Sequence, residues 1–129
     1  MAHPNAELVR RGFEAFAAGD VATLDQLIAD DAKWHTPGRN PLAGDFDGKA
    51  AILESFARIR AETDSFNQDV HAILADDDHV VALVNATITR GGKTLEVQQT
   101  LVFHIADGKA TEVWAFPTDQ YAVDEFWAN

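Results

Sequence analysis

Cysteine is absent from this sequence, which excludes a disulfide framework and catalysis by a thiolate. Basic residues are few, since 10 Lys and Arg stand against 21 Asp and Glu, and the formal charge is -11. A phosphate backbone or an anionic membrane would repel such a chain, so we expect neither a nucleic-acid nor a membrane partner. No apolar run approaches membrane-spanning length, and Met1 to Asn5 carry no apolar signal segment. These absences predict a cytoplasmic protein.

The sequence also lacks the usual signatures of metal and cofactor sites. Its five histidines are scattered, with no two at the spacing that places metal ligands on one helix face. The acidic run Asp76-Asp77-Asp78 lacks the pattern of a calcium loop and is typical of a solvated turn. No glycine-rich loop leads from a strand into a helix, and neither Ser55 nor Ser65 has a marked base. We therefore expect no metal and no cofactor.

A β-rich stretch from Val80 to Pro117 is the feature around which the chain is organised. Two sharp reversals divide it, at Gly91-Gly92 and at Asp107-Gly108, and such dipeptides favour two-residue turns because both central residues need positive φ. The stretch therefore predicts three antiparallel strands, at Val80 to Thr89, Thr94 to Ile105 and Lys109 to Pro117. At 129 residues with 47% apolar content, the chain is expected to form one domain over residues 1–129.

Two-residue turns also predict which side chains share a face of the sheet. Across the glycine pair, Gln99 faces Val84 and is the single polar residue on an otherwise apolar face. The same arithmetic at the second turn sets Trp114 beside Leu101 and Phe116 beside Gln99. The opposite face is predicted to be polar, with Asn85, Thr87, Glu96, Gln98 and Thr100.

A further strand, Phe66 to Ala75, reverses into this meander through the three aspartates. If the turn centres on Asp77 and Asp78, His71 faces Val84 and joins Gln99 on the apolar face. A slip of one residue in this longer loop would turn His71 outward.

Helical periodicity and capping residues predict the remaining elements. Gly12 lies within the apolar stripe of the first helix, where it costs about 1 kcal/mol relative to Ala. It serves either close packing or room for a ligand, and we favour packing. The expected elements are a helix capped by Asn5 and ending at Gly19, a helix capped by Asp20, a short edge strand from Ala32 to Thr36, a flap over residues 37–46, a helix capped by Asp47, and a short helix or irregular lid from Thr118 to Trp127.

Helices followed by hairpins indicate an α+β fold with helices on one face of a curved antiparallel sheet. In order and spacing, several short motifs resemble the NTF2-like (ketosteroid isomerase-like) superfamily, and within it SnoaL-like proteins. These motifs are Ala18-Gly19-Asp20, Ala29-Asp30-Asp31-Ala32, Gly44, Gly48, Asp107-Gly108-Lys109, Glu112-Val113-Trp114 and Asp119. The resemblance implies a cone-shaped sheet wrapped around three helices (an NTF2-like/cystatin-like α+β barrel), a pocket opening near the edge strand and flap, and a homodimer formed through the sheet.

Known catalytic sets of that superfamily do not carry over to this sequence. Where ketosteroid isomerases have a Tyr and two Asp, this chain has Gly12, Thr36 and, depending on a one-residue offset, Gln99 or Thr100. Where SnoaL-type polyketide cyclases place an Asp after the strand-borne Trp, it has Ala115. The epoxide hydrolases of this fold require a buried Arg between two Asp, and no Arg falls on the predicted inward face.

The remaining candidates for chemistry are two imidazoles and one amide. His35 at the mouth and His71 on the sheet titrate near neutrality and could move a proton, while Gln99 could hold a ligand oxygen. Structural interpretations compete with these roles. In one, a backbone carbonyl satisfies each histidine; in another, Gln99 pairs with His71 only to satisfy both groups. The expected pocket walls are Trp34, Thr36, Val84, Trp114 and Phe116.

These residues leave three functions open. The first is a cofactor-free isomerase or cyclase that acts by acid/base chemistry on an apolar substrate bearing a carbonyl group. The second is a non-catalytic protein that binds a small apolar molecule in the same pocket, which the missing carboxylates favour. The third is a dimerisation module in which the polar sheet face, with Asn85, Gln98 and Thr100, meets its twin.

Overall fold

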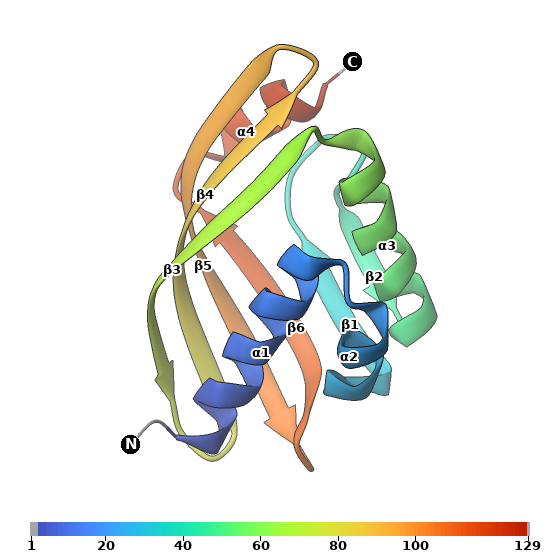
Figure 1. The fold of residues 1–129 in the computed structure, drawn as a ribbon, viewed down its shortest axis with the longest axis vertical. Coiled ribbons are helices and arrows are strands. Elements are labelled where there is room, and N and C mark those ends of the chain that lie inside the picture. The colour runs from blue at the N-terminus through green and yellow to red at the C-terminus, as the bar shows by residue number, and fades with distance from the viewer. Residues whose placement is uncertain (1–2, 129) are drawn as a thin grey trace.

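A computed structural model describes residues 3–128, which form four helices and one six-stranded curved sheet (Figure 1). The strand order is β2-β1-β6-β5-β4-β3; β1 and β6 run parallel and the other neighbours antiparallel. This confirms the predicted α+β class with a curved sheet, although the sheet does not close into a barrel. The elements are α1 (Pro4–Ala18), α2 (Val21–Leu27), β1 (Ile28–Thr36), β2 (Gly44–Asp47), α3 (Lys49–Glu62), β3 (Ser65–Ala75), β4 (His79–Arg90), β5 (Lys93–Ala106), β6 (Lys109–Pro117) and α4 (Gln120–Trp127).

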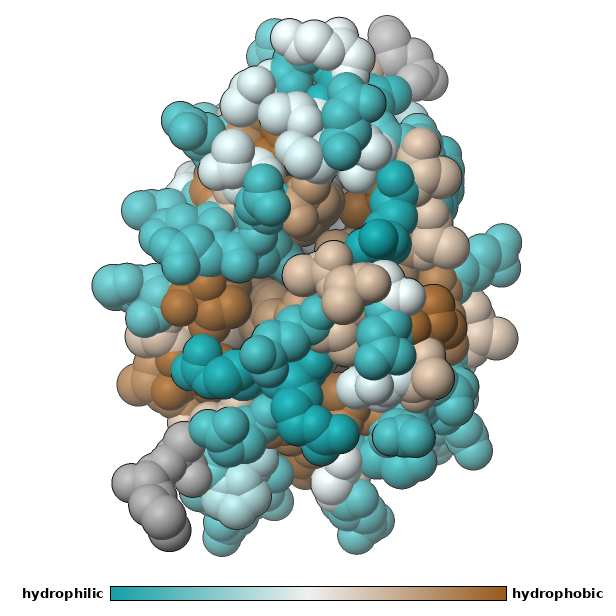
Figure 2. Space-filling view, in the orientation of Figure 1, coloured by the Kyte–Doolittle hydropathy of each residue, from teal (hydrophilic) through white to brown (hydrophobic). Residues whose placement is uncertain are grey.

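Helices cover one face of the sheet, which we call the inner face, and the opposite face is the outer face. In Figure 1, α1 crosses the lower half of the sheet, α3 runs beside it, and α4 lies near the β4–β5 turn. Val9 of α1 packs into a core cluster with Val84, Leu101, Phe103 and Val113 of the sheet. Hydrophilic side chains dominate the helix-covered side of the surface, with apolar ones showing between them (Figure 2).

No helix among residues 3–128 combines the length and the apolar character needed to cross a membrane.

The glycine pair sets the register of the first hairpin as predicted. Gly91 and Gly92 both adopt positive φ, 54° and 80°, and Gln99 pairs with Val84. The inward side chains of β5 are therefore Leu95, Val97, Gln99, Leu101 and Phe103, and all but Gln99 are buried.

A β-bulge makes the predicted register of the second hairpin wrong. Ile105 pairs with Ala110 but His104 pairs with Glu112, so Thr111 is an extra residue in β6. Trp114 is consequently opposite Val102, and Phe116 opposite Thr100, on the outer face. Ala115 and Pro117 take the inward positions beside Leu101 and Gln99 that had been assigned to the two aromatic residues.

A second bulge displaces His71. Val70 pairs with Val84 and Ala72 with Leu83, so His71 is the unpaired residue between them and its side chain is exposed. Its predicted place opposite Val84 is therefore wrong, although Ile73 does pair with Ala82 as expected.

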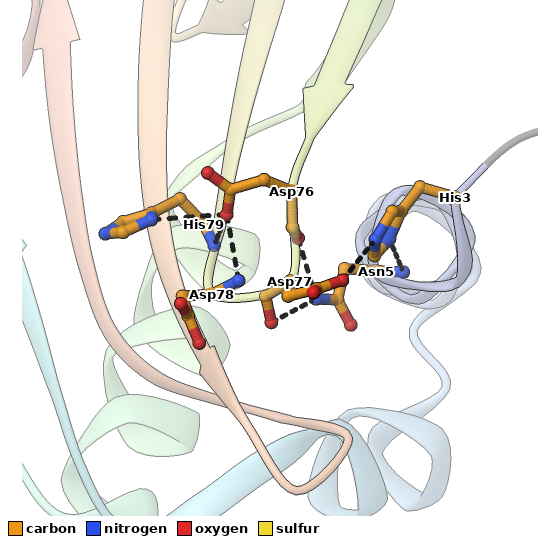
Figure 3. Close-up of polar contacts among 6 residues, drawn as sticks. All are labelled: His3, Asn5, Asp76, Asp77, Asp78 and His79. Carbon is orange, nitrogen blue, oxygen red and sulfur yellow. Dashed lines mark hydrogen bonds and ion pairs between the residues drawn. The ribbon is translucent and has the colours of Figure 1, made fainter.

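Two of the predicted helix starts are also wrong. Helix α1 is capped by His3, whose Nδ1 accepts a hydrogen bond from the Asn5 backbone N–H at 3.0 Å. Asn5 instead donates through its side chain to the carbonyls of Asp76 and Asp77, tying α1 to the β3–β4 turn (Figure 3). The cap of α3 is Gly48 rather than Asp47, because this position has a φ of 92° that disfavours other residues.

The predicted edge strand lies inside the sheet. Residues 44–46, expected within the flap, form β2 together with Asp47 and pair with β1 on the side away from β6. This leaves residues 37–43 as the connecting loop, which we call the flap loop. The C-terminal segment is helical, the first of its two predicted alternatives.

Candidate ligand-binding cavity

A cavity of about 190 Å³ lies between the inner face of the sheet and the helices. The alternation of β5 brings Gln99, Leu101 and Phe103 to its wall, and β1 contributes Trp34 and Thr36 from the same side of its own alternation. The flap loop and α4 complete the lining.

Aromatic side chains form the rigid part of the cavity wall. Phe16 of α1 makes edge-to-face contacts with both Phe56 and Phe66, with ring centroids 5.5 and 5.4 Å apart. Trp34 stands edge-to-face against Phe56 at 4.9 Å. Each such pair contributes about 0.5–1.5 kcal/mol beyond the burial of its area, which favours a wall of fixed shape.

Gly12 lines the cavity, and close packing does not explain it. A Cβ added there would meet only Leu27 Cδ1 at 3.9 Å, an ordinary van der Waals contact. The packing interpretation favoured from the sequence is therefore not supported. The missing side chain leaves space inside the cavity instead.

The polar groups of the lining are uncharged. Within residues 3–128, no Asp, Glu, Lys, Arg or His lines the cavity. Its polar side chains are Thr36, Asn40, Gln68, Gln99 and Gln120, besides the indole groups of two tryptophans. The described residues also contain no group of three or more His, Cys, Asp or Glu side chains that could hold a metal ion.

Asp124 ties the flap loop to α4 at one end of the cavity. Its Oδ1 accepts hydrogen bonds from Asn40 Nδ2 at 2.8 Å, the Arg39 backbone N–H at 2.9 Å and Gln120 Nε2 at 3.1 Å. These donors, Asn40 foremost, lower the pKa of Asp124 below its usual value. Gly38 fits here because it has a φ of 113° and a Cβ would collide with Gln120 and Asp124. We call this set of contacts the flap latch.

His35 points to the outer face, away from the cavity. Its Nδ1 lies 2.7 Å from Asp45 Oδ1 and its Nε2 lies 2.7 Å from Glu112 Oε2. Carboxylates only accept hydrogen bonds, so both contacts are satisfied when the imidazole carries a proton on each nitrogen. Asp45 and then Glu112 accordingly raise the pKa of His35. The ring stacks on Trp114, with centroids 5.3 Å apart.

The residues predicted to form one site are thus divided between different places. Trp34, Thr36 and Gln99 line the cavity. Val84 is buried in the core without lining it. His35, Trp114 and Phe116 lie on the outer face, and His71 is exposed at the β3 bulge. The proposed His71–Gln99 pair is absent from the described contacts.

Sequence reasoning missed three polar contributors and preferred close packing over room for a ligand at Gly12. Gln68 occupies an inward position of β3 that the alternation would have indicated once a bulge at His71 was allowed. Gly12 carried a signal, the cost of glycine in a helix, but the wrong explanation was preferred. Nothing in the sequence points to Asn40 and Gln120, because the flap latch joins segments about 80 residues apart.

Comparison with known proteins shows the family of this chain. The model of the SnoaL-like domain matches residues 9–113. This chain belongs to the SnoaL-like family. An uncharacterised protein of Mycobacterium tuberculosis is 33% identical over 95% of both chains.

Solved structures extend the likeness to the NTF2-like fold. Bal32a, from a soil-derived mobile gene cassette, has a TM-score of 0.92 at 42% identity and covers 96% of each chain. An NTF2-like protein of unknown function from Burkholderia pseudomallei has a TM-score of 0.89 at 17% identity, covering 99% of this chain and 100% of the other. IdmH of Streptomyces antibioticus, proposed elsewhere to be a polyketide cyclase, has a TM-score of 0.75 at 23% identity over 91% and 93%.

Proposed function

We propose that this SnoaL-like protein binds a small, predominantly apolar molecule in the cavity between the sheet and its helices. The observation that carries the proposal is a preformed apolar space whose polar lining groups are few and uncharged. The space retained at Gly12 supports the same conclusion, since an added Cβ would make only an ordinary van der Waals contact there.

An isomerase or cyclase is the second candidate, supported by the fold shared with IdmH. Acid/base catalysis needs a titratable group within hydrogen-bond reach of the ligand. Neither His35 nor His71 lines the cavity, so a reaction here would depend on positioning the substrate and on hydrogen bonds from neutral groups such as Gln99. Binding without catalysis is therefore the function that we favour.

Filling the cavity tests the proposal. Gly12→Leu should abolish binding of uncharged one- and two-ring compounds. Calorimetry measures this binding, as does the rise in unfolding temperature that a ligand of the native state produces. Gly12→Ala is the matched control: it adds one methyl group in open space and should stabilise α1 by up to ~1 kcal/mol.

Failure of naphthalene, 1-tetralone and related neutral compounds to bind the wild-type protein would refute the proposal. Equal affinity of these compounds for the wild type and for Gly12→Leu would refute the cavity as the binding site.

We also infer that two copies of the chain associate through the outer face. Phe116 is 54% exposed. Across the outer face it lies opposite Thr100, which in turn lies opposite Leu83. Two residues along the strands, Trp114 lies opposite Val102. An apolar centre surrounded by polar side chains is the usual composition of a protein interface.

Sedimentation equilibrium tests this inference. Phe116→Ser should shift the equilibrium toward monomer, whereas Tyr121→Ser should not, because Tyr121 is 89% exposed and belongs to α4, not to the outer face of the sheet. A wild-type protein that remains monomeric at high concentration would overturn it.

A further inference from the structure

Two glutamine amides in the cavity have no protein partner. Within residues 3–128, the side chains of Gln68 and Gln99 make no hydrogen bond, although both line the cavity. Asn40 and Gln120, which also line it, are engaged by Asp124 in the flap latch. The other polar lining groups are the Thr36 hydroxyl on β1 and the indole N–H groups of Trp34 and Trp127, each with fewer bonding sites than an amide. The two full amides left for a ligand therefore lie on β3 and β5.

Unpaired amides beside apolar walls destabilise a protein unless water or a ligand satisfies them. No polar side-chain atom of the described residues is both fully buried and unpaired, and both amides are partly buried residues of the cavity lining. Each offers an acceptor oxygen and two donor hydrogens, and can bond a carbonyl or a hydroxyl group equally well.

The two amides are spaced along the cavity. Gln68 is opposite Ala86 and Gln99 is opposite Val84, on the two strands that flank β4. Two strand spacings and a displacement of two residues separate their backbones by about 12 Å. This separation suits a ligand with two polar groups at different positions better than a ligand with one.

Resting on the function proposed above, we propose that Gln68 and Gln99 are specificity-determining residues that select an uncharged ring compound bearing two separate hydrogen-bonding groups, at least one an acceptor such as a carbonyl oxygen. An anionic ligand is disfavoured because no cationic side chain lines the cavity within residues 3–128. The volume fits this class, since a cavity of about 150 Å³ in another protein accommodates benzene.

A graded set of probes tests the proposal by calorimetry: naphthalene with no polar group, 1-tetralone with one, 6-hydroxy-1-tetralone with two, and 1-naphthoate with a carboxylate. For the wild-type protein, affinity should rise by roughly three- to tenfold with each polar group. 1-Naphthoate should bind at least about tenfold more weakly than 1-tetralone, at an ionic strength that screens the net charge.

Isosteric variants assign each step to a residue. Gln99→Met and Gln68→Met should each remove one step of the gradient while leaving naphthalene binding unchanged or improved. Gln98→Met, at an exposed position of the outer face, is the matched control and should change nothing. The side-chain amide resonances of Gln68 and Gln99 should shift on titration with 6-hydroxy-1-tetralone, which gives a readout that needs no variant.

The outcomes separate the two proposals. If naphthalene binds but the polar probes gain nothing, or if the Met variants keep the full gradient, the role of the glutamines is refuted and the binding function stands. If 1-naphthoate binds best, the selection for uncharged ligands is refuted. If no probe binds, the proposed function fails and takes this inference with it.

Discussion

The two faces of one sheet carry opposite chemistry. On the inner face the polar side chains that line the cavity are neutral, and two of their amides have no hydrogen-bond partner among residues 3–128. On the outer face His35 is held between Asp45 and Glu112, and rings of His79, His104 and Trp114 lie in contact across adjacent strands. Because neighbouring residues of a strand face opposite sides, strand register alone keeps the charges out of the cavity.

The sharpest test of this contrast compares two variants of β5, one with an aspartate on the inner face and one with an aspartate on the outer face. Leu101→Asp should reduce the free energy of unfolding by at least ~4 kcal/mol, because Leu101 is buried and an aspartate there has no cationic partner. Thr100→Asp, the next residue toward the N-terminus, should cost under ~1 kcal/mol on the outer face. Urea unfolding at low protein concentration measures both, and similar losses would remove the distinction between faces.

Truncating a phenylalanine on each face should have the next largest effect. Phe103→Ala removes a buried ring that packs against Phe13 and Trp34, and should cost about 3–5 kcal/mol. Phe116→Ala should cost ~0.5 kcal/mol or less, since more than half of this side chain is exposed. A larger loss for Phe116 than for Phe103 in the monomer would contradict the observed β6 register.

Titration of His35 should affect stability through the outer face. Its pKa is raised in the folded protein, so its stabilising contribution is complete below the unfolded value of about 6.5 and is lost as the pH rises through the folded value. The pair is partly solvated, so the change should be on the order of 1 kcal/mol or less.

The difference in unfolding free energy between wild type and His35→Gln isolates this effect, because the His3–Asp77 and His79–Asp76 contacts occur in both proteins. The difference should shrink above neutral pH. A difference that is constant from pH 5 to about 9 would show that His35 is not charged in the folded state.

The flap latch provides the smallest predicted effect. It lies in the loop between β1 and β2, the two strands that the His35–Asp45 contact joins on the outer face. Asp124→Ala removes the acceptor shared by Arg39, Asn40 and Gln120, so the Arg39 amide should exchange its hydrogen faster. Acidification should do the same as the pH falls through the lowered pKa of Asp124.

Asp119→Ala is the control for this variant, because Asp119 caps α4 through the Ala122 amide without touching the flap loop. Unchanged exchange at Arg39 in Asp124→Ala would mean that the latch does not hold the loop.

Local chemistry explains which parts of the structure could be predicted. Gly91 and Gly92 carry their positive φ in their residue type, so the pairing of Gln99 with Val84 followed from the sequence. Asp20 likewise caps α2 as expected, accepting from the Thr23 amide at 3.1 Å.

The bulges had no such signal. Thr111 and His71 are ordinary strand residues, and neither residue type marks the position that is left unpaired. A shift of one residue reverses every later side chain, which is why Trp114 and Phe116 were assigned to the wrong face. The flap latch could not be predicted from the sequence either, since it depends on how the flap loop meets α4 in space.

Because the sheet remains open, its two borders decide whether chains stack edge to edge. One border, β2, is only four residues long and presents Asp45 and Asp47, while the other, β3, is interrupted at His71 and exposes Asp69. Short length, negative charge and a kinked backbone each discourage a foreign strand from extending the ladder. Protection against amyloid-like growth is therefore built into both margins of this protein.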